Sequence, residues 1–340
     1  MKLPGLKDFD FKEKRVLVRC DLDVPLKEGE VAENSRIKEC LPTVEYLLEK
    51  KAFIILAGHL GRPQGKEVEE LKMLPVAREI SRLMKRSLAG YKKMKFFSFY
   101  DLGEDLLLLE NLRFFKGEEE NSPEFTEKLS SLAEIYINEA FAVSHRKHAS
   151  VVGVPLVLPS ASGFHFEKEV TSLSKTIENP KKPLVFIIGG AKPETKLSYV
   201  YEFAQKADWV LVGGLLPLQK EKDKENIIWA SLNKNGTDID ESSIEEFKKI
   251  ISEAKTLVFN GPMGKYEEPG SEKGTREVAQ AVADSLALKI VGGGDTIASL
   301  TKFKLLNKMD YVSTAGGACL EFLAKGTLPG IEALKRGKND

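Results

Sequence analysis

The 340-residue chain has few of the residues that mark secreted or metal-rich proteins, with three cysteines, four histidines and two tryptophans. The cysteines, Cys20, Cys40 and Cys319, are odd in number and far apart. Their spacing matches neither a disulfide framework nor a zinc site. We therefore expect reduced thiols in the interior of a cytoplasmic protein.

Long apolar runs and an excess of either charge are also missing. No stretch approaches the ~18 apolar residues of a membrane span, and the charged first 14 residues lack the apolar run of a signal peptide. Lys+Arg and Asp+Glu both number 51, so a net charge of zero argues against a nucleic acid or a membrane surface as partner. With 42% hydrophobic residues the chain is not disordered, and its length suits two domains.

Arginine and glycine are unevenly distributed along this balanced chain. Nine of eleven arginines precede residue 151, whereas nineteen of the 27 glycines follow residue 150. Because arginine binds anions through its side chain and glycine allows close approach of the backbone, the two halves are expected to carry different kinds of site.

Short apolar runs, nearly all continuous rather than alternating, recur along the chain. They cover residues 16–18, 53–56, 106–109, 135–137, 184–188, 210–212, 257–259, 290–291 and 311–313. Such runs are typical of strands buried on both faces. Helical patterns over 68–88, 124–133 and 244–254 separate them, so the chain is predicted to be α/β with parallel sheets flanked by helices.

A helical pattern over 167–177 lies between two clusters of glycine and proline. Because glycine and proline interrupt regular secondary structure, a helix between two such clusters is predicted to connect two lobes. We expect an N-terminal lobe over 1–160, a connecting helix and hinge over 161–182, a C-terminal lobe over 183–318 and a final segment over 319–340.

Polar residues follow each predicted strand of the first half, at the sheet edge where ligands bind in open parallel sheets. The candidates are Arg19, Asp21, Asp23, His59, Arg62, Asn111, Arg113, His145, Arg146 and His148. Because the arginine fork matches carboxylate and phosphate, their convergence predicts a small acidic substrate. Taken singly, each arginine is better explained as a surface or salt-bridge residue, so the prediction depends on the agreement of four strand ends. No cysteine or carboxylate completes a metal set with His145 and His148.

Glycine-rich turns follow the predicted strands of the second half. They are Gly189-Gly190-Ala191-Lys192-Pro193-Glu194-Thr195-Lys196, Asn260-Gly261-Pro262-Met263-Gly264, Gly292-Gly293-Gly294-Asp295-Thr296 and Ala315-Gly316-Gly317. Each alone could be a tight strand-to-helix connection. Together, with paired lysines on one face of an opening helix and an aspartate able to hold Mg²⁺, they favour a nucleoside triphosphate over NAD. The chain contains no P-loop motif.

Eight motifs in order resemble the phosphoglycerate kinase family across nearly the whole chain. They are RVLVRCDLDVPL, LAGHLGRP, LENLRF, NEAFAVSHRKHAS, GGAKPETK, FNGPMGKYE, VGGGDT and VSTAGGACL. The resemblance implies two Rossmann-like lobes joined by an interdomain helix and hinge, with the final segment returning toward the first lobe. It also implies a cytoplasmic glycolytic monomer that binds 3-phosphoglycerate or 1,3-bisphosphoglycerate in the first lobe and MgATP or MgADP in the second.

Site residues follow from the resemblance position by position. The implied substrate set is Asp21, Asp23, Arg36, His59, Arg62, Arg113 and Arg146. The implied nucleotide set is Gly190, Ala191, Lys196, Gly214, Asn260, Pro262, Glu267, Gly293, Gly294, Asp295 and Thr296. Asp295 is the implied Mg²⁺ contact. The implied catalytic set is Arg36, Lys192, Lys196, Gly316 and Gly317.

Departures from the family pattern bear on activity. Asp23 stands where the family usually has Asn, Thr195 where Asp is common, and Ala315 where a glycine is usual. The turn Gly213-Gly214-Leu215 lacks a third glycine, and the chain is short for the family, notably around 220–240. A catalytically weakened relative acting as a binding protein is the alternative, and a kinase for another acid or sugar is a second. Assays with a panel of substrates distinguish them.

Overall fold

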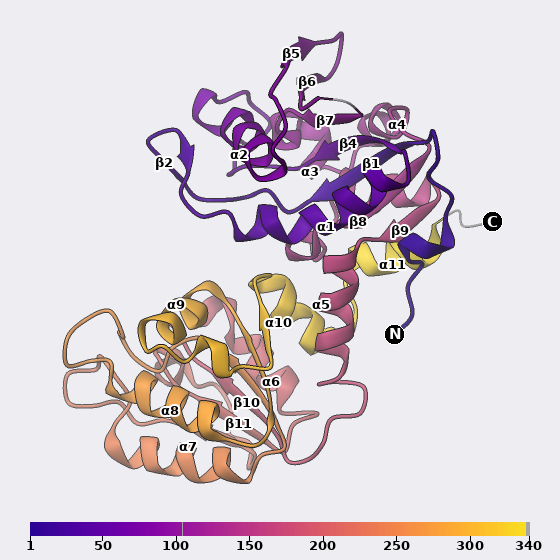
Figure 1. Ribbon diagram of the computed structural model, residues 1–340. Coiled ribbons are helices and arrows are strands. Elements are labelled where there is room, and N and C mark those ends of the chain that lie inside the picture. Colours follow the sequence, from indigo (N-terminus) through magenta and orange to yellow (C-terminus); the bar gives the residue numbers. More distant parts are fainter. Residues whose placement is uncertain (104, 338–340) are drawn as a thin grey trace. The chain divides into compact units, whose positions relative to one another are not determined.

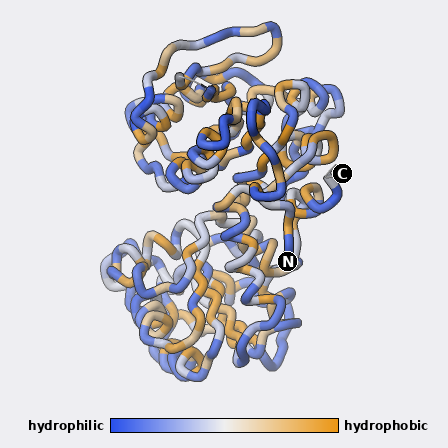
Figure 2. Tube along the Cα trace, turned by 45° about the vertical axis from the view of Figure 1, so that its right-hand side comes forward, coloured by the Kyte–Doolittle hydropathy of each residue, from blue (hydrophilic) through white to orange (hydrophobic). Residues whose placement is uncertain are grey.

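The structure, a computed structural model, describes residues 1–103 and 105–337. The chain divides into two compact units, one of Met1–Val170 with Thr327–Asp340 and one of Thr171–Gly326. Each unit contains a sheet flanked by helices (Figure 1), which confirms the predicted α/β class. Apolar positions concentrate inside each unit and hydrophilic ones on its outside (Figure 2).

The sheet of the first unit has seven strands in the order β5-β6-β7-β4-β1-β8-β9. Their bounds are β1 Arg15–Cys20, β4 Phe53–Ala57, β5 Gly90–Lys93, β6 Ser98–Asp101, β7 Leu106–Leu109, β8 Ile135–Glu139 and β9 Ser160–Ser162. Five strands are parallel, but β6 runs antiparallel to both β5 and β7. The sheet is therefore predominantly parallel, as predicted, with antiparallel pairing confined to this edge. All four residues of β5 are exposed, so it lacks the apolar run that marks a buried strand.

Helices α1 (Ser35–Glu49) and α2 (Leu74–Met84) cover one face of this sheet. Their apolar residues join alternate residues of β1, Val16 and Val18, in one core. Because successive strand residues point to opposite faces, Arg19 lies on the other face. There its side chain reaches Ser150. A separate antiparallel hairpin pairs β2 (Leu26–Lys27) with β3 (Glu30–Val31).

The sheet of the second unit is parallel throughout, in the order β12-β11-β10-β13-β14-β15. Its strands are β10 Leu184–Ile188, β11 Trp209–Val212, β12 Ile227–Trp229, β13 Thr256–Asn260, β14 Leu288–Gly292 and β15 Tyr311–Ser313. Helices α7 (Glu241–Glu253), α8 (Lys273–Asp284) and α9 (Gly294–Lys302) contribute to a core with one sheet face (Figure 1). On the other face, Phe186 stacks on Phe203 of α6 (Leu197–Phe203), and α6 contacts α10 (Gly317–Lys325).

Helix α5 (Phe164–Ser174) carries the chain from the first unit into the second, and α11 (Pro329–Arg336) belongs to the first unit. The first unit also contains α3 (Lys116–Glu119) and α4 (Pro123–Ser130). Shorter helical turns are η1 Leu6–Asp8, η2 Glu69–Leu71, η3 Leu112–Phe114, η4 Phe141–Val143, η5 Ala149–Gly153, η6 Val154–Leu156, η7 Pro193–Thr195, η8 Leu216–Gln219 and η9 Leu306–Lys308. All three cysteines are buried thiols that form no disulfide, as predicted. In the described part of the chain, no helix is both long and apolar enough to cross a membrane.

Candidate functional site

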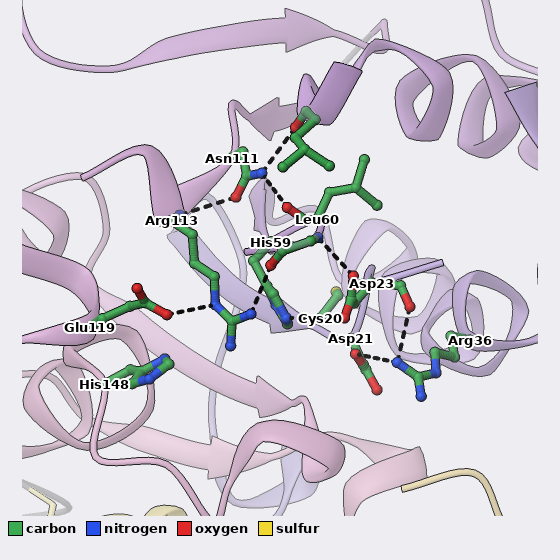
Figure 3. A network of polar contacts seen from close by, with 12 residues as sticks. Cys20, Asp21, Asp23, Arg36, His59, Leu60, Asn111, Arg113, Glu119 and His148 are labelled. Atoms are coloured by element: carbon green, nitrogen blue, oxygen red, sulfur yellow. Dashed lines mark hydrogen bonds and ion pairs between the residues drawn. The ribbon is translucent and has the colours of Figure 1, made fainter. Parts of the chain in front are cut away.

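The polar side chains of the first unit gather at the carboxyl ends of β1, β4, β7 and β8 (Figure 3). Asp21 and Asp23 follow β1, His59 follows β4, Arg113 follows β7, and His148 lies in the segment after β8. These four strands are neighbours in the order β7-β4-β1-β8, so their carboxyl ends lie side by side. We call this edge, with Arg36 of α1, the basic rim.

Arg19 is fully buried beneath the basic rim. Its Nε donates to Ser150 Oγ at 2.9 Å, and one terminal nitrogen lies 3.0 Å from His59 Nδ1. Since a guanidinium only donates, Nδ1 of His59 must accept, and the ring proton is therefore on Nε2. Glu118, also fully buried, completes the network by accepting from the Ser150 hydroxyl at 2.5 Å and from its backbone N–H at 2.9 Å.

This proton on His59 faces Asp23, whose Oδ2 lies 3.6 Å from Nε2. The other carboxylate oxygen of Asp23 accepts from the Gly61 backbone N–H at 2.8 Å. Burial opposes ionisation of Asp23, but its contacts with His59, Gly61 and Arg36 lower its pKa to about 2. Burial, together with the charges of Arg19 and Arg113, lowers the pKa of His59 to about 4. At neutral pH the pair is therefore a carboxylate and a neutral imidazole.

Arg36 points toward the carboxyl end of β1 from the start of α1 (Figure 3). One terminal nitrogen donates to the Asp23 backbone carbonyl at 3.0 Å and contacts Asp21 Oδ1 at 3.4 Å. Its side chain remains 29% exposed, so it combines a fixed position with access to a ligand.

Arg113 is held in place by the loop after β4. Its guanidinium donates to the Gly61 carbonyl at 2.8 Å, and its Nε lies 3.4 Å from Glu119. Asn111 fixes this loop by donating to the carbonyls of Leu60 at 2.7 Å and Leu71 at 2.9 Å (Figure 3). Five of the seven substrate residues implied by the sequence thus gather at one rim, namely Asp21, Asp23, Arg36, His59 and Arg113.

Two arginines of the predicted substrate set, Arg62 and Arg146, are exposed, unlike the other members. His148 is buried, and burial together with the neighbouring arginines lowers its pKa to about 3. Its Nδ1 lies 3.9 Å from Glu118 Oε1. No group of three or more metal-ligating side chains occurs among the residues that the structure describes.

In the second unit, backbone replaces side chains at the corresponding edge. The turns after β11, β10, β13 and β14 lie in that order along the sheet. Leu215 N–H donates to the Gly190 carbonyl at 2.9 Å, and Gly214 N–H donates to Met263 at 3.0 Å. We call this edge the glycine rim.

The glycines of this rim are required by contact distance. A Cβ added to Gly261, whose φ is +97°, would lie 2.0 Å from the Gly189 carbonyl oxygen. One added to Gly214 would lie 2.4 Å from the Gly190 nitrogen, and one added to Gly189 would lie 2.2 Å from the Pro262 carbonyl oxygen. Side chains cannot be accommodated where these turns meet.

Lys196 lies at the centre of the glycine rim. Its ammonium donates to the Gly189 carbonyl and to Asn260 Oδ1, both at 2.8 Å. Burial lowers its pKa to about 8, opposed by the nearby charge of Asp295. Asn260 also donates to the Gly292 carbonyl at 2.8 Å, so it links Lys196 to the turn after β14.

Lys192 and Lys196 do not share a face of an opening helix, contrary to our expectation. They flank the single turn η7, and α6 begins only at Leu197. Pro193 excludes the helical conformation for the residue before it, and Lys192 accordingly has ψ of 79°. Its side chain is exposed, whereas that of Lys196 is largely buried.

Helix α9 begins at the third glycine turn, with Gly293 at φ +95° as its N-cap. Thr296 is buried, and its hydroxyl donates to the Gly292 carbonyl at 2.8 Å and accepts from Gly261 N–H at 2.6 Å. Asp295 is exposed in the first helical turn. One carboxylate beside free backbone donors fits Mg²⁺, which binds through one or two carboxylates and the phosphates of its nucleotide.

The remaining predicted nucleotide and catalytic residues lie in segments that follow strands of the same sheet. Gly316, with φ +54°, is the N-cap of α10, and Gly317 is exposed at its first position. Pro262 is buried in the turn after β13, while Glu267 and Ala191 are exposed. Gly294 begins α9.

Sequence reasoning missed three supporting residues. Ser150 and Glu118 hold Arg19, and the Thr275 hydroxyl accepts from the backbone N–H groups of Met263 and Gly264 at 3.0 and 3.1 Å. Glu118 belongs to an acidic run that resembles a solvated surface. Only the fold brings it beneath the basic rim, 32 residues before Ser150.

Comparison with known proteins identifies the family of the chain. The family model described as phosphoglycerate kinase matches residues 6–222 and 216–326. Among curated relatives, the phosphoglycerate kinases of Thermosipho africanus and Borreliella afzelii are 38% and 37% identical. The alignments cover 98% and 99% of this chain and 98% and 100% of the relatives.

Solved structures of such enzymes have the same fold. Phosphoglycerate kinase from Coxiella burnetii superimposes with a TM-score of 0.82 at 34% identity, covering 99% of this chain and all of that one. The enzyme from Pyrococcus horikoshii gives 0.79 at 30% identity, with 98% and 99% coverage. The chain belongs to the phosphoglycerate kinase family.

Proposed function

We propose that the basic rim binds 3-phosphoglycerate or 1,3-bisphosphoglycerate, that the glycine rim binds MgATP or MgADP, and that phosphoryl transfer runs directly and in line between them. The observation that carries this proposal is the contrast between the rims. One offers arginine forks to a small acid, and the other offers backbone donors and a lysine to a polyphosphate.

The acceptor is a carboxylate, which is already ionised at neutral pH, so the reaction requires no general base. The residues present agree with this requirement. His59 has its pKa lowered to about 4 and points its Nε2 toward Asp23. We assign it to substrate orientation, and Arg36 to the reacting carboxyl.

For the nucleotide, Lys196 and the backbone donors at the starts of α9 and α10 would hold the phosphates, and Asp295 would hold Mg²⁺. The metal supplies charge neutralisation at the transferred group. Lys192, whose side chain is exposed, is outside the packing that confines Lys196 and would accompany the transferred phosphoryl group. Gly316 and Gly317 would place N–H donors and a positive helix end at this group.

A coupled assay tests the proposal. The intact protein with ATP, Mg²⁺ and 3-phosphoglycerate should form an acyl phosphate, detected with an acyl-phosphate-dependent dehydrogenase. Arg36→Ala should lower kcat at least about 100-fold, because a charge aimed at the transition state is lost. The matched control is Arg78→Ala, which removes an exposed arginine paired with Glu30 and should leave kcat unchanged.

Three results would contradict the proposal. No turnover by the intact protein would contradict the kinase and favour a binding protein. Faster turnover with another carboxylic acid or a sugar would assign a different acceptor. Equal loss in Arg36→Ala and Arg78→Ala would contradict the assigned role of Arg36.

A further inference from the structure

Helix α5, which carries the chain between the units, has no capping side chain of its own, because Gly163 precedes it. Its first three N–H groups are satisfied from elsewhere. Phe164 donates to Thr43 Oγ1 at 2.9 Å, and His165 and Phe166 donate to the two carboxylate oxygens of Glu139, each at 3.0 Å. A helix is usually capped by its immediately preceding residue, so a cap built from α1 and β8 is a distinct feature.

The hydrogen bonds of this cap have a defined direction. The Thr43 hydroxyl accepts from Phe164 and donates its own proton to Glu139 Oε1 at 2.6 Å. Glu139 thus accepts three bonds, and a glutamine in its place would turn an N–H donor toward one of these donors. Burial raises the pKa of Glu139 to about 7, while these three bonds oppose the shift.

Gly163 makes room for this carboxylate. A Cβ at position 163 would lie 2.2 Å from Glu139 Oε2 and 2.5 Å from its carboxyl carbon. A larger residue at 163 would displace the carboxylate from the helix end. Glycine at this position therefore both removes a local capping side chain and allows Glu139 to cap the helix.

The same cap is connected to the basic rim through α1. Thr43 follows Arg36 by seven residues, two helical turns, so both lie on one face of α1. Arg36 contacts the Asp23 carbonyl at 3.0 Å at one end of this face, and Thr43 contacts Glu139 and Phe164 at the other. Four residues beyond Phe166, α5 crosses from the first unit into the second.

We propose that Thr43 and Glu139 are positioning residues that transmit substrate binding at Arg36 to the first turn of α5. The proposal rests on the proposed function, because it assumes that 3-phosphoglycerate binds beside Arg36. Movement of α1 toward a ligand shifts Thr43, and the shared hydrogen bonds carry the shift into the connector helix. Neither residue belongs to the substrate, nucleotide or catalytic sets implied by the sequence.

Thr43→Val and Thr43→Ser are matched tests. Valine keeps the volume and removes both hydrogen bonds, whereas serine keeps the hydroxyl. At pH 8, where the Glu139 carboxylate predominates, Thr43→Val and Glu139→Gln should lower kcat at least tenfold with less than threefold change in KM for 3-phosphoglycerate. Thr43→Ser should retain most of kcat.

Hydrogen exchange provides a readout that needs no turnover. Saturating 3-phosphoglycerate should slow exchange of the amides of residues 164–166 in the wild type and in Thr43→Ser, and not in Thr43→Val. If the wild type is an active kinase but 3-phosphoglycerate does not change the exchange rates of the 164–166 amides, the proposed transmission through the cap is wrong and the proposed function stands. This measurement uses the wild type, so it is decisive even if a variant does not fold. A wild type that neither binds the acid nor turns over would overturn both.

Discussion

The two units present different chemical groups at the carboxyl ends of their parallel strands. The basic rim is built from side chains held by a buried network around Arg19, which is fully buried. The glycine rim is built from backbone turns in contact with one another, where an added Cβ would lie as close as 2.0 Å to a carbonyl oxygen. The first unit should therefore be sensitive to charge, and the second to volume.

Titratable groups follow the same division. All four histidines belong to the first unit, and the lowered pKa values of three of them arise chiefly from burial. At the glycine rim of the second unit the buried titratable group is Lys196, whose pKa of about 8 leaves it mostly charged at neutral pH. Four substitutions or conditions can break or sharpen this contrast.

The largest effect is expected from Arg19→Met. It removes the hydrogen bonds of Arg19 to Ser150 and His59, and it removes the buried positive charge that acts on the fully buried Glu118, which accepts from the same Ser150. Removing one of two opposite buried charges costs about 3 to 5 kcal/mol in the free energy of unfolding. Chemical denaturation measures it. Arg78→Met, which breaks the exposed pair with Glu30, should cost less than about 1 kcal/mol. A similarly small loss in both variants would show that the buried network around Arg19 stabilises the first unit no more than an exposed ion pair does.

Acidification should weaken the first unit. The pKa values of His59 and His165 are lowered to about 4 and that of His148 to about 3, so the unfolded chain binds more protons below pH 6.5. Stability should fall as pH decreases from about 6.5 to 4, by about 3 kcal/mol for His59 alone. Glu139, with its pKa raised to about 7, acts in the opposite direction and offsets part of the loss.

Fluorescence can separate the units in this experiment, because the chain's two tryptophans, Trp209 and Trp229, both lie in the second unit. Hydrogen exchange in β1 and β4 should accelerate at a higher pH than the tryptophan signal changes. Simultaneous loss of both signals, or earlier loss of the tryptophan signal, would contradict the assignment of acid sensitivity to the first unit.

Gly261→Ala tests the volume sensitivity of the second unit. The new Cβ would meet the Gly189 carbonyl oxygen at 2.0 Å in a residue with φ of +97°. We expect a loss of about 2 kcal/mol and weaker MgADP binding. The control is Gly294→Ala, where nothing lies within 4 Å of the added Cβ, and thermal unfolding should be nearly unchanged. Equal effects of the two would show that contact at the glycine rim does not limit stability.

The sequence was sufficient to predict which residues share an edge. Continuous apolar runs identify buried parallel strands, and the residues after such strands meet at one side of a sheet. This reasoning anticipated Asp23, His59 and Arg113 on one rim and Gly190 and Asn260 on the other. It could not anticipate the exposed edge strand β5, because no apolar run marks it.

Contacts that depend on tertiary packing lay beyond reach of the sequence. Arg19 donates to Ser150, which lies 131 residues later in the chain, and no local sequence pattern predicts a contact between residues so far apart in the sequence. Glu139 and Thr43 cap α5 from two other elements, where Gly163 alone suggested only a break. In the second unit, Pro193 explains why Lys192 and Lys196 separate, and that local rule was available from the sequence.

The smallest expected effect is that of Asp23→Asn. The substitution removes a carboxylate from the rim that should receive an anionic substrate, and repulsion at about 4 Å in water amounts to about 1 kcal/mol. Titration of the variant should therefore show about fivefold tighter binding of 3-phosphoglycerate, with Asp8→Asn as an exposed control.

The loss of hydrogen bonds in Asp23→Asn opposes the gain in binding that comes from the removed charge. Gly61 N–H and the Nε2 proton of His59 both point at Asp23, so an asparagine must turn its amide N–H toward one of two donors. If this mismatch outweighs the removed charge, 3-phosphoglycerate will bind equally or more weakly. That result would contradict the prediction and would mean that the basic rim, like the glycine rim, selects by the geometry of its donors rather than by net charge.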